Sequence, residues 1–432
     1  MSDTSIQNAD TEPHPNQPES LPATAELDRG QLDPRRISRL ERLLLKRMVQ
    51  KSCPRSIRVT YGENDEIVAA TLPISHTITI RTRPALRSLL RQNVMGFLDG
   101  YASGSIDVEG DLIELLSHFQ RRYSLHPNPP SSFLRKIKTF LRRRQTLRSQ
   151  ANVKRHYDLG NDFYRFWLDE RMVYSCAYFE SESQGLEKAQ QRKLDYICRK
   201  LRLARNEEII EAGCGWGALA LHMAQHYGVR VKAFNLSDEQ LEFARERAMR
   251  MQLQHRVTFI KDDWREVRDR CDAFVSVGML EHVGPENLMH FGRVISKSLG
   301  ENGRGLIQTI GQNTVEPLCP WIEQRIFPGA QPPTLKEMMD IFEPFNLSVL
   351  DIENLRRHYA LTLRHWLDRF NRHAESIRLQ LGANFERMWR LYLASSASAF
   401  ETGSLQLYQV LFAPIGSSFS PMTRSDIYTV QF

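Results

Sequence analysis

Cysteine is scarce in this chain, and the cysteines do not have the spacing of disulfide pairs or metal ligands. Six cysteines lie scattered over 432 residues with no CxxC pair, which argues against a disulfide framework and against a metal site. No window approaches the roughly 18 uninterrupted apolar residues of a membrane-spanning helix. The first residues also lack the basic and apolar regions of a signal peptide. These absences favour a protein of the reducing cytosol.

The N-terminal composition and the net charge narrow the class further. Residues 1–35 are polar, Pro-rich and acidic, a composition that predicts a disordered tail. The whole chain carries a net charge of +7, so an anionic partner is expected. Charge alone leaves both nucleic acid and an acidic membrane face open.

Residues 36–126 predict a small α+β domain with no obvious catalytic constellation. Residues 37–50 have helical periodicity, and the runs IRVTYG, EIVAATLP and HTITIRT alternate as strands do. The following stretch, 85–119, is expected to be helical.

A basic segment follows and is expected to form a linker or helix over 127–150. From Arg135 to Arg155 it holds nine Lys or Arg residues and no acid, with apolar residues at helical spacing. It fits a solvated helix between two domains, and equally a surface helix drawn to anionic lipid headgroups. Whether it meets lipid or a second subunit stays open, so a homodimer remains one of the expected partners. Nucleic acid is disfavoured because no accompanying motif supports it.

From residue 195 onward, strand-like and helix-like segments alternate. The expected strands are EEIIEAG, VRVKAFN, VTFIKDD, AFVSVG and GRGLIQTIG, each separated from the next by a helix. A Pro-rich insertion, the run NLSVLDIENL, helices over about 363–400 and the run LQLYQVLFA complete the region. This order predicts a doubly wound α/β fold in which the late last strand enters antiparallel.

A glycine-rich turn, EAGCGWG at 211–217, follows the first of these strands. Glycines at a strand-to-helix turn let the backbone approach a ligand at the helix N-terminus. A dinucleotide loop would be GxGxxG with an acidic residue about 20 positions further on. Here the second strand ends in Asn235 instead, and Trp216 would crowd a pyrophosphate. The pattern favours S-adenosylmethionine (SAM), which has no phosphates, over NAD.

Two further strand ends carry polar or aromatic residues suited to a nucleoside. Asn235 and Gln240 follow the second strand, where they could hydrogen-bond a ribose. Asp263 and Trp264 follow the third, where they could clasp and stack on an adenine. Because ligands of open α/β sheets sit beyond the carboxyl ends of the strands, these segments are expected to meet the glycine turn there.

Several longer motifs resemble one family. YSCAYF, IIEAGCGWGALALHMAQHYGVRVKAFNLSDEQ, VSVGMLEHVGPENL, IFPGAQPP and HYALTLRHW occur in the order found in cyclopropane-fatty-acyl-phospholipid synthases and mycolic acid cyclopropane synthases. The similarity covers 150–432, and the weaker GYASGSIDVEGDL resembles the small N-terminal domain of the phospholipid enzymes. The resemblance implies a seven-stranded class I SAM-methyltransferase (Rossmann-like) domain over 151–432, with 36–126 as a smaller lipid-associated domain.

The resemblance also implies an activity: a SAM-dependent enzyme that adds a methylene across the cis double bond of an acyl chain in membrane phospholipid. Such an enzyme would be cytoplasmic and peripherally associated with the inner face of the membrane. The resemblance implies a cofactor site formed by Tyr174, Ser175, Gly213, Gly215, Gln240, Asp263 and Trp264. We add Trp216 and Asn235, which the sequence pattern places at the same strand ends. A bicarbonate ion acting as base would be held by residues matching Cys176, Glu281, Ile310 and Tyr359. At the fifth position of that set the family has His, and this chain has Gln308.

Residues 156–180 show why such chemistry suits the sequence. Eight of these 25 residues are Phe, Tyr or Trp, against 9% aromatic residues in the whole chain. An alkene that attacks the electrophilic methyl of SAM becomes a carbocation, which water would quench. Aromatic rings exclude water and stabilise the cation, by roughly 0.5–2 kcal/mol per well-placed ring. The stretch is therefore expected to supply part of a dry wall.

For each proposed catalytic residue, a purely structural role is the alternative. Cys176 is expected to be a small polar group beside the base, since no step needs a covalent intermediate, or else an inert buried thiol. Glu281 and Tyr359 are expected to act in the site, against readings as a structural carboxylate and a helix cap. His282 could serve as a base or merely pack.

Gln308 leaves the product open. An amide can donate to a bicarbonate oxygen as His does, but it cannot be cationic or relay a proton near neutral pH. With a weakened base, a lipid C-methyltransferase that makes methyl- or methylene-branched chains is the alternative. A lipid-binding protein without activity is disfavoured by the intact glycine turn. A nucleic-acid methyltransferase is disfavoured by the lack of an Asn/Asp-Pro-Pro-aromatic motif.

Overall fold

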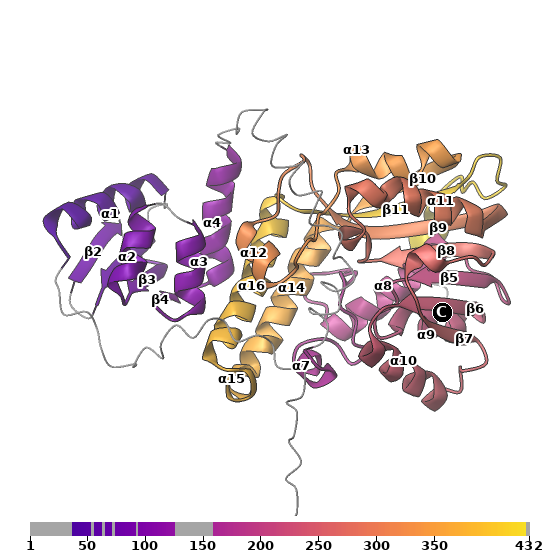
Figure 1. Cartoon of the computed structure of the whole chain (residues 1–432), viewed down its shortest axis with the longest axis horizontal. Helices are drawn as coiled ribbons and strands as arrows, with labels where there is room; N and C mark the ends of the chain where they lie inside the picture. Colours follow the sequence, from indigo (N-terminus) through magenta and orange to yellow (C-terminus); the bar gives the residue numbers. More distant parts are fainter. Residues whose placement is uncertain are drawn as a thin grey trace, which may run out of the picture.

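The computed structural model describes residues 37–52, 56–62, 65–70, 74–91, 94–125 and 159–428. Figure 1 shows two β-sheets toward opposite ends of the molecule, with a layer of long helices between them. The predictions of a tail at 1–35 and of a basic linker at 127–150 lie outside the described residues.

The larger sheet has seven strands in the order β10-β11-β9-β8-β5-β6-β7. Strands β5 to β9 pair in parallel, whereas β11 runs antiparallel to both of its neighbours. The predicted doubly wound sheet and its late antiparallel strand are confirmed, with β11 inserted between β9 and β10. The strands are β5 (Glu208–Ala212), β6 (Arg230–Asn235), β7 (Val257–Lys261), β8 (Cys271–Val277), β9 (Leu299–Gly311), β10 (Leu347–Asn354) and β11 (Gln406–Pro414).

Helices cover both faces of this sheet, so successive strand residues alternate between two apolar cores. In β5, Ile209 belongs to the core on one face and Ile210 to the core on the other, and each is 1% exposed. Strands buried on both faces are mostly apolar, and in β5 Ile209, Ile210 and Ala212 are buried side by side with the acidic Glu211. The helices that pack on the sheet include α8 (Leu186–Lys200), α9 (Ala218–Tyr227), α10 (Asp238–Arg250) and α11 (Leu288–Ser298).

The smaller sheet has the order β2-β1-β3-β4. The predicted helix at 37–50 and the three predicted strands are confirmed as α1 (Arg39–Ser52), β1 (Ser56–Tyr61), β2 (Asp65–Ala70) and β3 (His76–Ile80). Residues of β3 alternate between buried and half-buried, which is the pattern of a sheet with one face on a core.

Two helical predictions are wrong. The stretch 85–119 is not continuous helix: it divides into α2 (Arg83–Leu90), α3 (Val94–Ala102), β4 (Ile106–Glu109) and α4 (Leu112–Leu125). Gly104 turns the chain at φ +77°, and the fully buried Ile106 then pairs with Ile80 of β3. The helix expected after VTFIKDD is only a single 3-10 turn, η2 (Trp264–Glu266), because β8 begins five residues later at Cys271.

The helical layer between the sheets is built from the predicted helical stretch near the C-terminus. It comprises α14 (Arg356–Arg372), α15 (Ala374–Leu381) and α16 (Ala383–Thr402). One apolar core runs from Leu45 of α1 to Trp389 of α16 and on to Trp216 of the glycine turn. The remaining short elements are α7 (Asn161–Arg165), η3 (Leu280–His282), η4 (Pro285–Asn287), α12 (Pro320–Arg325), α13 (Leu335–Met338), η5 (Met339–Ile341), η6 (Glu343–Phe345) and α17 (Ser425–Tyr428).

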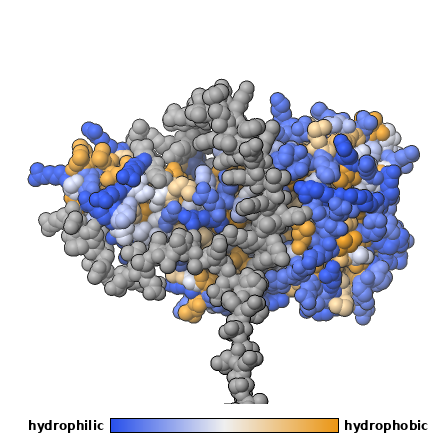
Figure 2. All heavy atoms as spheres, in the orientation of Figure 1, coloured by the Kyte–Doolittle hydropathy of each residue, from blue (hydrophilic) through white to orange (hydrophobic). Residues whose placement is uncertain are grey.

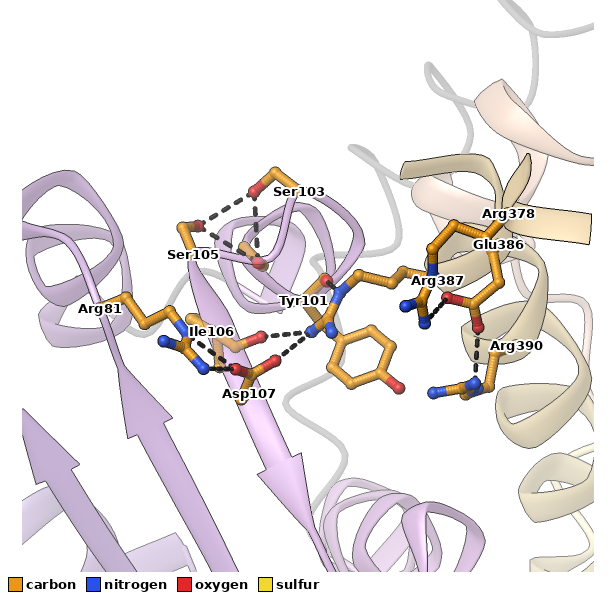
Figure 3. Close-up of polar contacts among 11 residues, drawn as sticks. Arg81, Tyr101, Ser103, Ser105, Ile106, Asp107, Arg378, Glu386, Arg387 and Arg390 are labelled. Atoms are coloured by element: carbon orange, nitrogen blue, oxygen red, sulfur yellow. Dashed lines mark hydrogen bonds and ion pairs between the residues drawn. The ribbon is translucent and has the colours of Figure 1, made fainter. Parts of the chain in front are cut away.

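Helix α16 fixes the small sheet to the rest of the chain through Arg387 (Figure 3). Its guanidinium donates to the carbonyls of Tyr101 and Ile106, at 2.6 and 2.8 Å, and pairs with the carboxylate of Asp107 at 2.7 Å. A second contact joins α12 to α3, where Trp321 Nε1 donates to Asp99 at 2.9 Å. Charge-assisted hydrogen bonds of this kind hold two elements in a defined orientation.

Among the described residues, no helix is long and apolar enough to cross a membrane, and no group of three or more His, Cys, Asp or Glu could hold a metal ion. The five described cysteines are all free, and only Cys319 is exposed. Cys53 lies outside the described residues.

Candidate active site

A cavity lies at the carboxyl ends of β5, β6 and β8. The register aligns these ends, because Ala212 of β5 pairs with Phe234 of β6 and with Ser276 of β8. All nine residues that the sequence predicted for a cofactor site line this cavity: Tyr174, Ser175, Gly213, Gly215, Trp216, Asn235, Gln240, Asp263 and Trp264. Segments about 90 residues apart in sequence thus meet where open α/β sheets bind ligands.

Each of the three glycines of the turn has a different structural role. Gly213 has φ +85°, and its N–H donates to the Phe234 carbonyl at 2.9 Å. A side chain at Gly217 would lie 2.7 Å from the ring of Phe259, so helix α9 could not pack where it does. Gly215 has φ +53°, and a Cβ added there would have no neighbour within 4 Å, so its backbone is open to a ligand.

Two buried polar atoms in the cavity have no hydrogen-bond partner: Gln240 Nε2 and Glu211 Oε2. Asn235 Nδ2 donates to Gln240 Oε1 at 2.7 Å, which fixes the amide so that its nitrogen remains a donor. Buried polar groups normally have partners, so both atoms indicate a ligand. One donor and one acceptor suit the carboxylate and the ammonium of an amino-acid group, such as the methionyl end of SAM.

Lys193 of α8 lies on the floor of the cavity beside Glu211. It is 2% exposed and donates from Nζ to Ser175 Oγ at 3.0 Å. Burial lowers the pKa of Lys193 to about 8, and burial raises the pKa of Glu211 to about 8 against the pull of Lys193. Sequence reasoning missed both residues. The acid directly before the glycine turn was a usable signal for Glu211, whereas nothing in its helix marked Lys193.

The residues expected at a nucleoside are held by contacts of their own. Both carboxylate oxygens of Asp263 accept from Arg265 Nη1, at 2.9 and 3.0 Å. The ring of Trp264 meets that of Phe291 edge-on, with centroids 5.1 Å apart. Trp216 Nε1 donates to the side chain of Asn161 at 2.6 Å. Contacts within the protein thus hold each of these side chains in position for a ligand.

The aromatic stretch forms one wall of the site. Tyr174 lines the cavity, and its hydroxyl lies 2.8 Å from that of Tyr392 on α16. We call the surrounding cluster the aromatic wall; its members are Tyr164, Trp167, Tyr174, Trp366, Trp389 and Tyr392. The ring centroids of Tyr174 and its neighbours Tyr164, Trp167 and Trp366 lie 5.2–5.5 Å apart, in the range of favourable ring contacts. Sequence periodicity did not reveal the members contributed by α14 and α16.

Glu281 and Ile310, two of the five predicted catalytic residues, are in direct contact. Glu281 Oε1 accepts the backbone N–H of Ile310 at 2.5 Å, and Oε2 is buried without a partner. Burial raises the pKa of Glu281 to about 7, despite the opposing hydrogen bond from Ile310. Its neighbours Met279 and His282 line the cavity. A carboxyl that titrates near neutral pH beside a cavity can act as a proton acceptor.

Gln308 lies two residues before Ile310 in β9, on the same face of the strand by alternation. Its Oε1 accepts from Gln409 Nε2 of β11 at 2.8 Å, and the two residues are direct partners in the sheet. No described residue accepts a hydrogen bond from Gln308 Nε2. The pair therefore leaves one amide nitrogen as a donor on the strand that binds the Glu281 carboxylate.

Cys176 and Tyr359, the remaining two, meet at the carbonyl of Leu355. Cys176 Sγ lies 4.0 Å from that oxygen, and Tyr359 donates its backbone N–H to it at 3.2 Å. Leu355 in turn bonds Leu407, the sheet partner of Ile310. Burial raises the pKa of Cys176 well above its ordinary value, which is the opposite of what a thiolate nucleophile needs.

His282 is not set up as a base in this arrangement. Burial alone lowers its pKa to about 4, and its ring lies 6.1 Å from that of Phe327. Phe327 in turn packs edge-on against Tyr392 of the aromatic wall, at 5.5 Å. His282 thus connects the η3 turn to the wall.

Comparisons with known proteins identify the relatives of this chain. A family model described as mycolic acid cyclopropane synthetase matches residues 144–410. The chain is 32% identical to a probable fatty acid methyltransferase of Pseudomonas putida, over 82% of this chain and 91% of the relative. It is 34% identical to the cyclopropane-fatty-acyl-phospholipid synthase of Escherichia coli K12, over 78% of this chain and 87% of the relative.

A solved structure of the same kind has a similar fold. The mycolic acid cyclopropane synthase CmaA1, complexed with SAH and CTAB, superposes with a TM-score of 0.58 at 27% identity. The match covers 61% of this chain and 97% of that one. A protein with this fold therefore holds the demethylated form of the cofactor for which the cavity residues are suited.

Proposed function

Because the chain belongs to the mycolic acid cyclopropane synthetase family and is a SAM-dependent methyltransferase, we propose that it forms cyclopropane fatty acids. It transfers a methylene group to the cis double bond of an unsaturated acyl chain in membrane phospholipid. The observation that carries the proposal is the buried Glu281 carboxylate, whose Oε2 has no hydrogen-bond partner and whose neighbours Met279 and His282 line the cavity. The Escherichia coli relative, whose name states this activity on phospholipid, supports the choice of substrate.

SAM, when bound, supplies an electrophilic methyl group to the alkene. The chain's own residues hold it: the amide nitrogen of Gln240 and the carboxylate of Glu211 are the free donor and acceptor for its amino-acid end. Lys193 donates a hydrogen bond to Ser175, and its charge attracts the Glu211 carboxylate. Trp264 and Asp263, fixed by Phe291 and Arg265, flank the position expected for the adenine.

The aromatic wall protects the cation that forms when the double bond is alkylated. Trp167 and Trp366 are fully buried and pack on Tyr174, so water has no access from that side. Each ring face turned toward the cation contributes about 0.5–2 kcal/mol of stabilisation. A dry site also strengthens the electrostatic effect of the nearby carboxylate.

Ring closure then requires removal of a proton from the added carbon. We propose that Glu281 either accepts it or orients a bicarbonate ion that does. We propose that the Ile310, Cys176 and Tyr359 region would complete a bicarbonate pocket with Gln308 Nε2 as an added donor. Such an ion would accept a hydrogen bond from Gln308 Nε2 and contact the free carboxylate oxygen of Glu281. An oxygen of the ion and an oxygen of Glu281 can form a hydrogen bond only if one of them carries a proton. The pKa of Glu281 near 7 permits that.

A second candidate is methyl or methylene branching of the acyl chain. Gln308 favours it, because an amide tied to Gln409 cannot relay a proton as an imidazole can. The Pseudomonas putida relative is named a probable fatty acid methyltransferase, which leaves such products open. The same cavity and aromatic wall would serve both reactions, which differ only in the fate of the cation.

Expression in a bacterial host without cyclopropane lipids tests the proposal. Cyclopropanation and methylene branching each add one CH₂ and are separated by fragmentation in the mass spectrometer, whereas a methyl branch also carries two added hydrogens. We expect cyclopropane chains with the native protein and at least about 100-fold fewer with Glu281→Gln. Branched chains alone would establish the second candidate. Unmodified lipids, together with no SAM binding in calorimetry, would indicate a lipid-binding protein without activity.

The substrate also sets the place of action. An enzyme that modifies chains within a bilayer works at the membrane surface, and we propose peripheral attachment to the cytoplasmic face.

A further inference from the structure

Helix α1 turns one apolar face inward and another outward. Leu45 is fully buried against the small sheet, together with Ile37 just before the helix. On the outward side, Leu40, Leu43 and Leu44 are 65%, 47% and 42% exposed. Their spacing puts them in one stripe on the helix surface. We call these three side chains the leucine face.

Exposed basic side chains lie on the same helix as the leucine face and near the end of the adjoining helix. Arg39, Lys46 and Arg47 are exposed on α1, Arg87 is exposed on the adjoining α2, and Arg91 is exposed directly after α2. None of the five forms an ion pair with a described residue. In Figure 2 the end of the molecule that carries α1, at the left, shows hydrophobic and hydrophilic side chains side by side.

The only acid of α1 does not offset this charge. Glu41 turns toward α2, where both of its carboxylate oxygens accept from Arg83 Nη2, at 2.7 and 2.8 Å. The outward surface therefore combines exposed leucines with positive charges that no described acidic residue pairs with. That combination is the signature of a helix that lies in the headgroup region of an anionic membrane.

We propose that the leucine face docks the protein on anionic phospholipid bilayers, with the leucines entering the acyl boundary and the five cations contacting headgroups. This inference rests on the proposed function, in which the substrate is a chain of a membrane lipid. The proposed docking surface consists of residues in and next to α1 and α2, and it does not include the basic segment at 127–150.

A second copy of this chain fits the surface less well. A two-fold symmetric contact brings the same patch of both copies together. Arg39, Lys46 and Arg47 of one copy would then face the same residues of the other, and like charges at close range oppose association. Anionic lipid supplies the opposite charge and the apolar phase together.

The leucine face is remote from the chemistry. Figure 1 shows α1 at the end of the molecule away from the larger sheet, and the Arg387 and Trp321 contacts tie its sheet to the helical layer. Docking through α1 would therefore recruit the whole molecule to the surface without altering the cavity. The expected signature is a loss of vesicle binding at unchanged intrinsic activity.

The test compares wild type with the triple variant Leu40→Gln, Leu43→Gln and Leu44→Gln, since Gln keeps helix propensity. Binding is measured by co-sedimentation with vesicles of phosphatidylglycerol and phosphatidylcholine bearing cis-unsaturated chains. Activity is measured on the same vesicles and on the same lipids dissolved in a nonionic detergent. The matched control is Met249→Gln on α10, whose side chain is 58% exposed.

We expect the triple variant to lose at least about tenfold in vesicle partitioning, with wild-type activity in detergent and wild-type Tm. The control should bind as wild type does. Unchanged vesicle binding overturns the proposal, and so does a triple variant whose only change is a smaller oligomer in solution. If vesicle binding falls but neither protein makes product, the proposed function fails while the docking surface stands.

A charge variant keeps the proposal falsifiable if the triple variant unfolds. Arg39→Gln, Lys46→Gln and Arg47→Gln change only exposed side chains. They should weaken binding to the phosphatidylglycerol vesicles several-fold and leave the weak binding to pure phosphatidylcholine vesicles unchanged. Equal binding of wild type and charge variant to both vesicle types would overturn the proposal.

Discussion

Glu281 accepts the backbone N–H of Ile310 through one carboxylate oxygen at 2.5 Å, while its other oxygen is buried without a partner. The hydrogen bond orients the carboxylate from β9, an inner strand of the sheet. The free oxygen is what remains for a proton or a bound ion. Because burial holds the pKa of this carboxyl near 7, the group is poised to change charge within the physiological range.

The first prediction concerns the pH dependence of activity. If ionised Glu281 acts in the site, kcat/KM should rise as pH increases through about 7 and then level off. Glu281→Gln should lower kcat by about 10²-fold or more and remove this step from the profile. Steady-state assays on detergent-dispersed phospholipid measure both. SAM affinity by calorimetry should stay unchanged, and a profile that keeps its step in the variant would assign the pKa elsewhere.

The second prediction concerns stability, which should fall over the same pH range in which kcat/KM rises. The pKa of Glu281 is raised from 4.5 to about 7 on folding, so the folded protein binds this proton more tightly than the unfolded chain does. Stability from this group is full below about pH 4.5 and is lost as pH rises through about 7. Glu281→Gln, which cannot ionise, should therefore raise the free energy of unfolding by about 1–3 kcal/mol at pH 8.

Urea unfolding at pH 8 and at pH 4.5 measures this difference, which should vanish at the lower pH. The exposed Glu246 on α10 provides the control, because Glu246→Gln changes the same groups on the surface. A Glu281→Gln protein that is less stable than wild type at pH 8 would mean that the carboxylate has a structural partner.

The third prediction concerns the cofactor. Gln240→Met removes the free amide donor and the acceptor that Asn235 uses, and should weaken SAM binding by about 10- to 100-fold. Gln254, exposed in the turn after α10, is the control, and Gln254→Met should bind SAM as wild type does. Calorimetric titration with SAM gives both affinities. Equal binding by the Gln240 variant would exclude its amide from the cofactor contact.

The fourth prediction concerns the departure from the family at Gln308. Gln308→His restores a group that can relay a proton, so it should raise the share of cyclopropane among the products, or leave it unchanged if the amide already suffices. Gln409→Met is the companion variant, because it removes the donor that fixes Gln308 without touching the site. It should lower the rate while Gln308→His does not. Loss of all SAM turnover in Gln308→His would contradict the placement of this residue.

The cofactor cavity could be predicted from the sequence because its residues occur in short local patterns. The glycine turn, Asn235 with Gln240, and Asp263 with Trp264 each follow a strand, and strand ends of a parallel sheet meet at one edge. Local patterns failed where tertiary contacts decide. Lys193 occupies an ordinary-looking amphipathic helix, and only the packing of α8 on β5 brings its ammonium beside Glu211.

The secondary-structure errors have the same origin. Apolar spacing around Ile106 fits a helix, but pairing with β3 makes the segment a strand. The role of Gln409 could not be predicted from its sequence neighbours, because it depends on the pairing of Gln409 with Gln308 across two antiparallel strands. The division of the chain into domains and the roles of the individual site residues remain predictions.

The most direct test follows the carbon itself. Purified protein is incubated with cis-unsaturated phosphatidylglycerol vesicles and SAM deuterated in its methyl group, and the released fatty acids are fragmented in the mass spectrometer. We expect a cyclopropane at the former double bond that has lost one deuterium per transferred group, and at least about 100-fold less of it with Glu281→Gln. A product that keeps every deuterium, or a turnover that does not depend on Glu281, would contradict it.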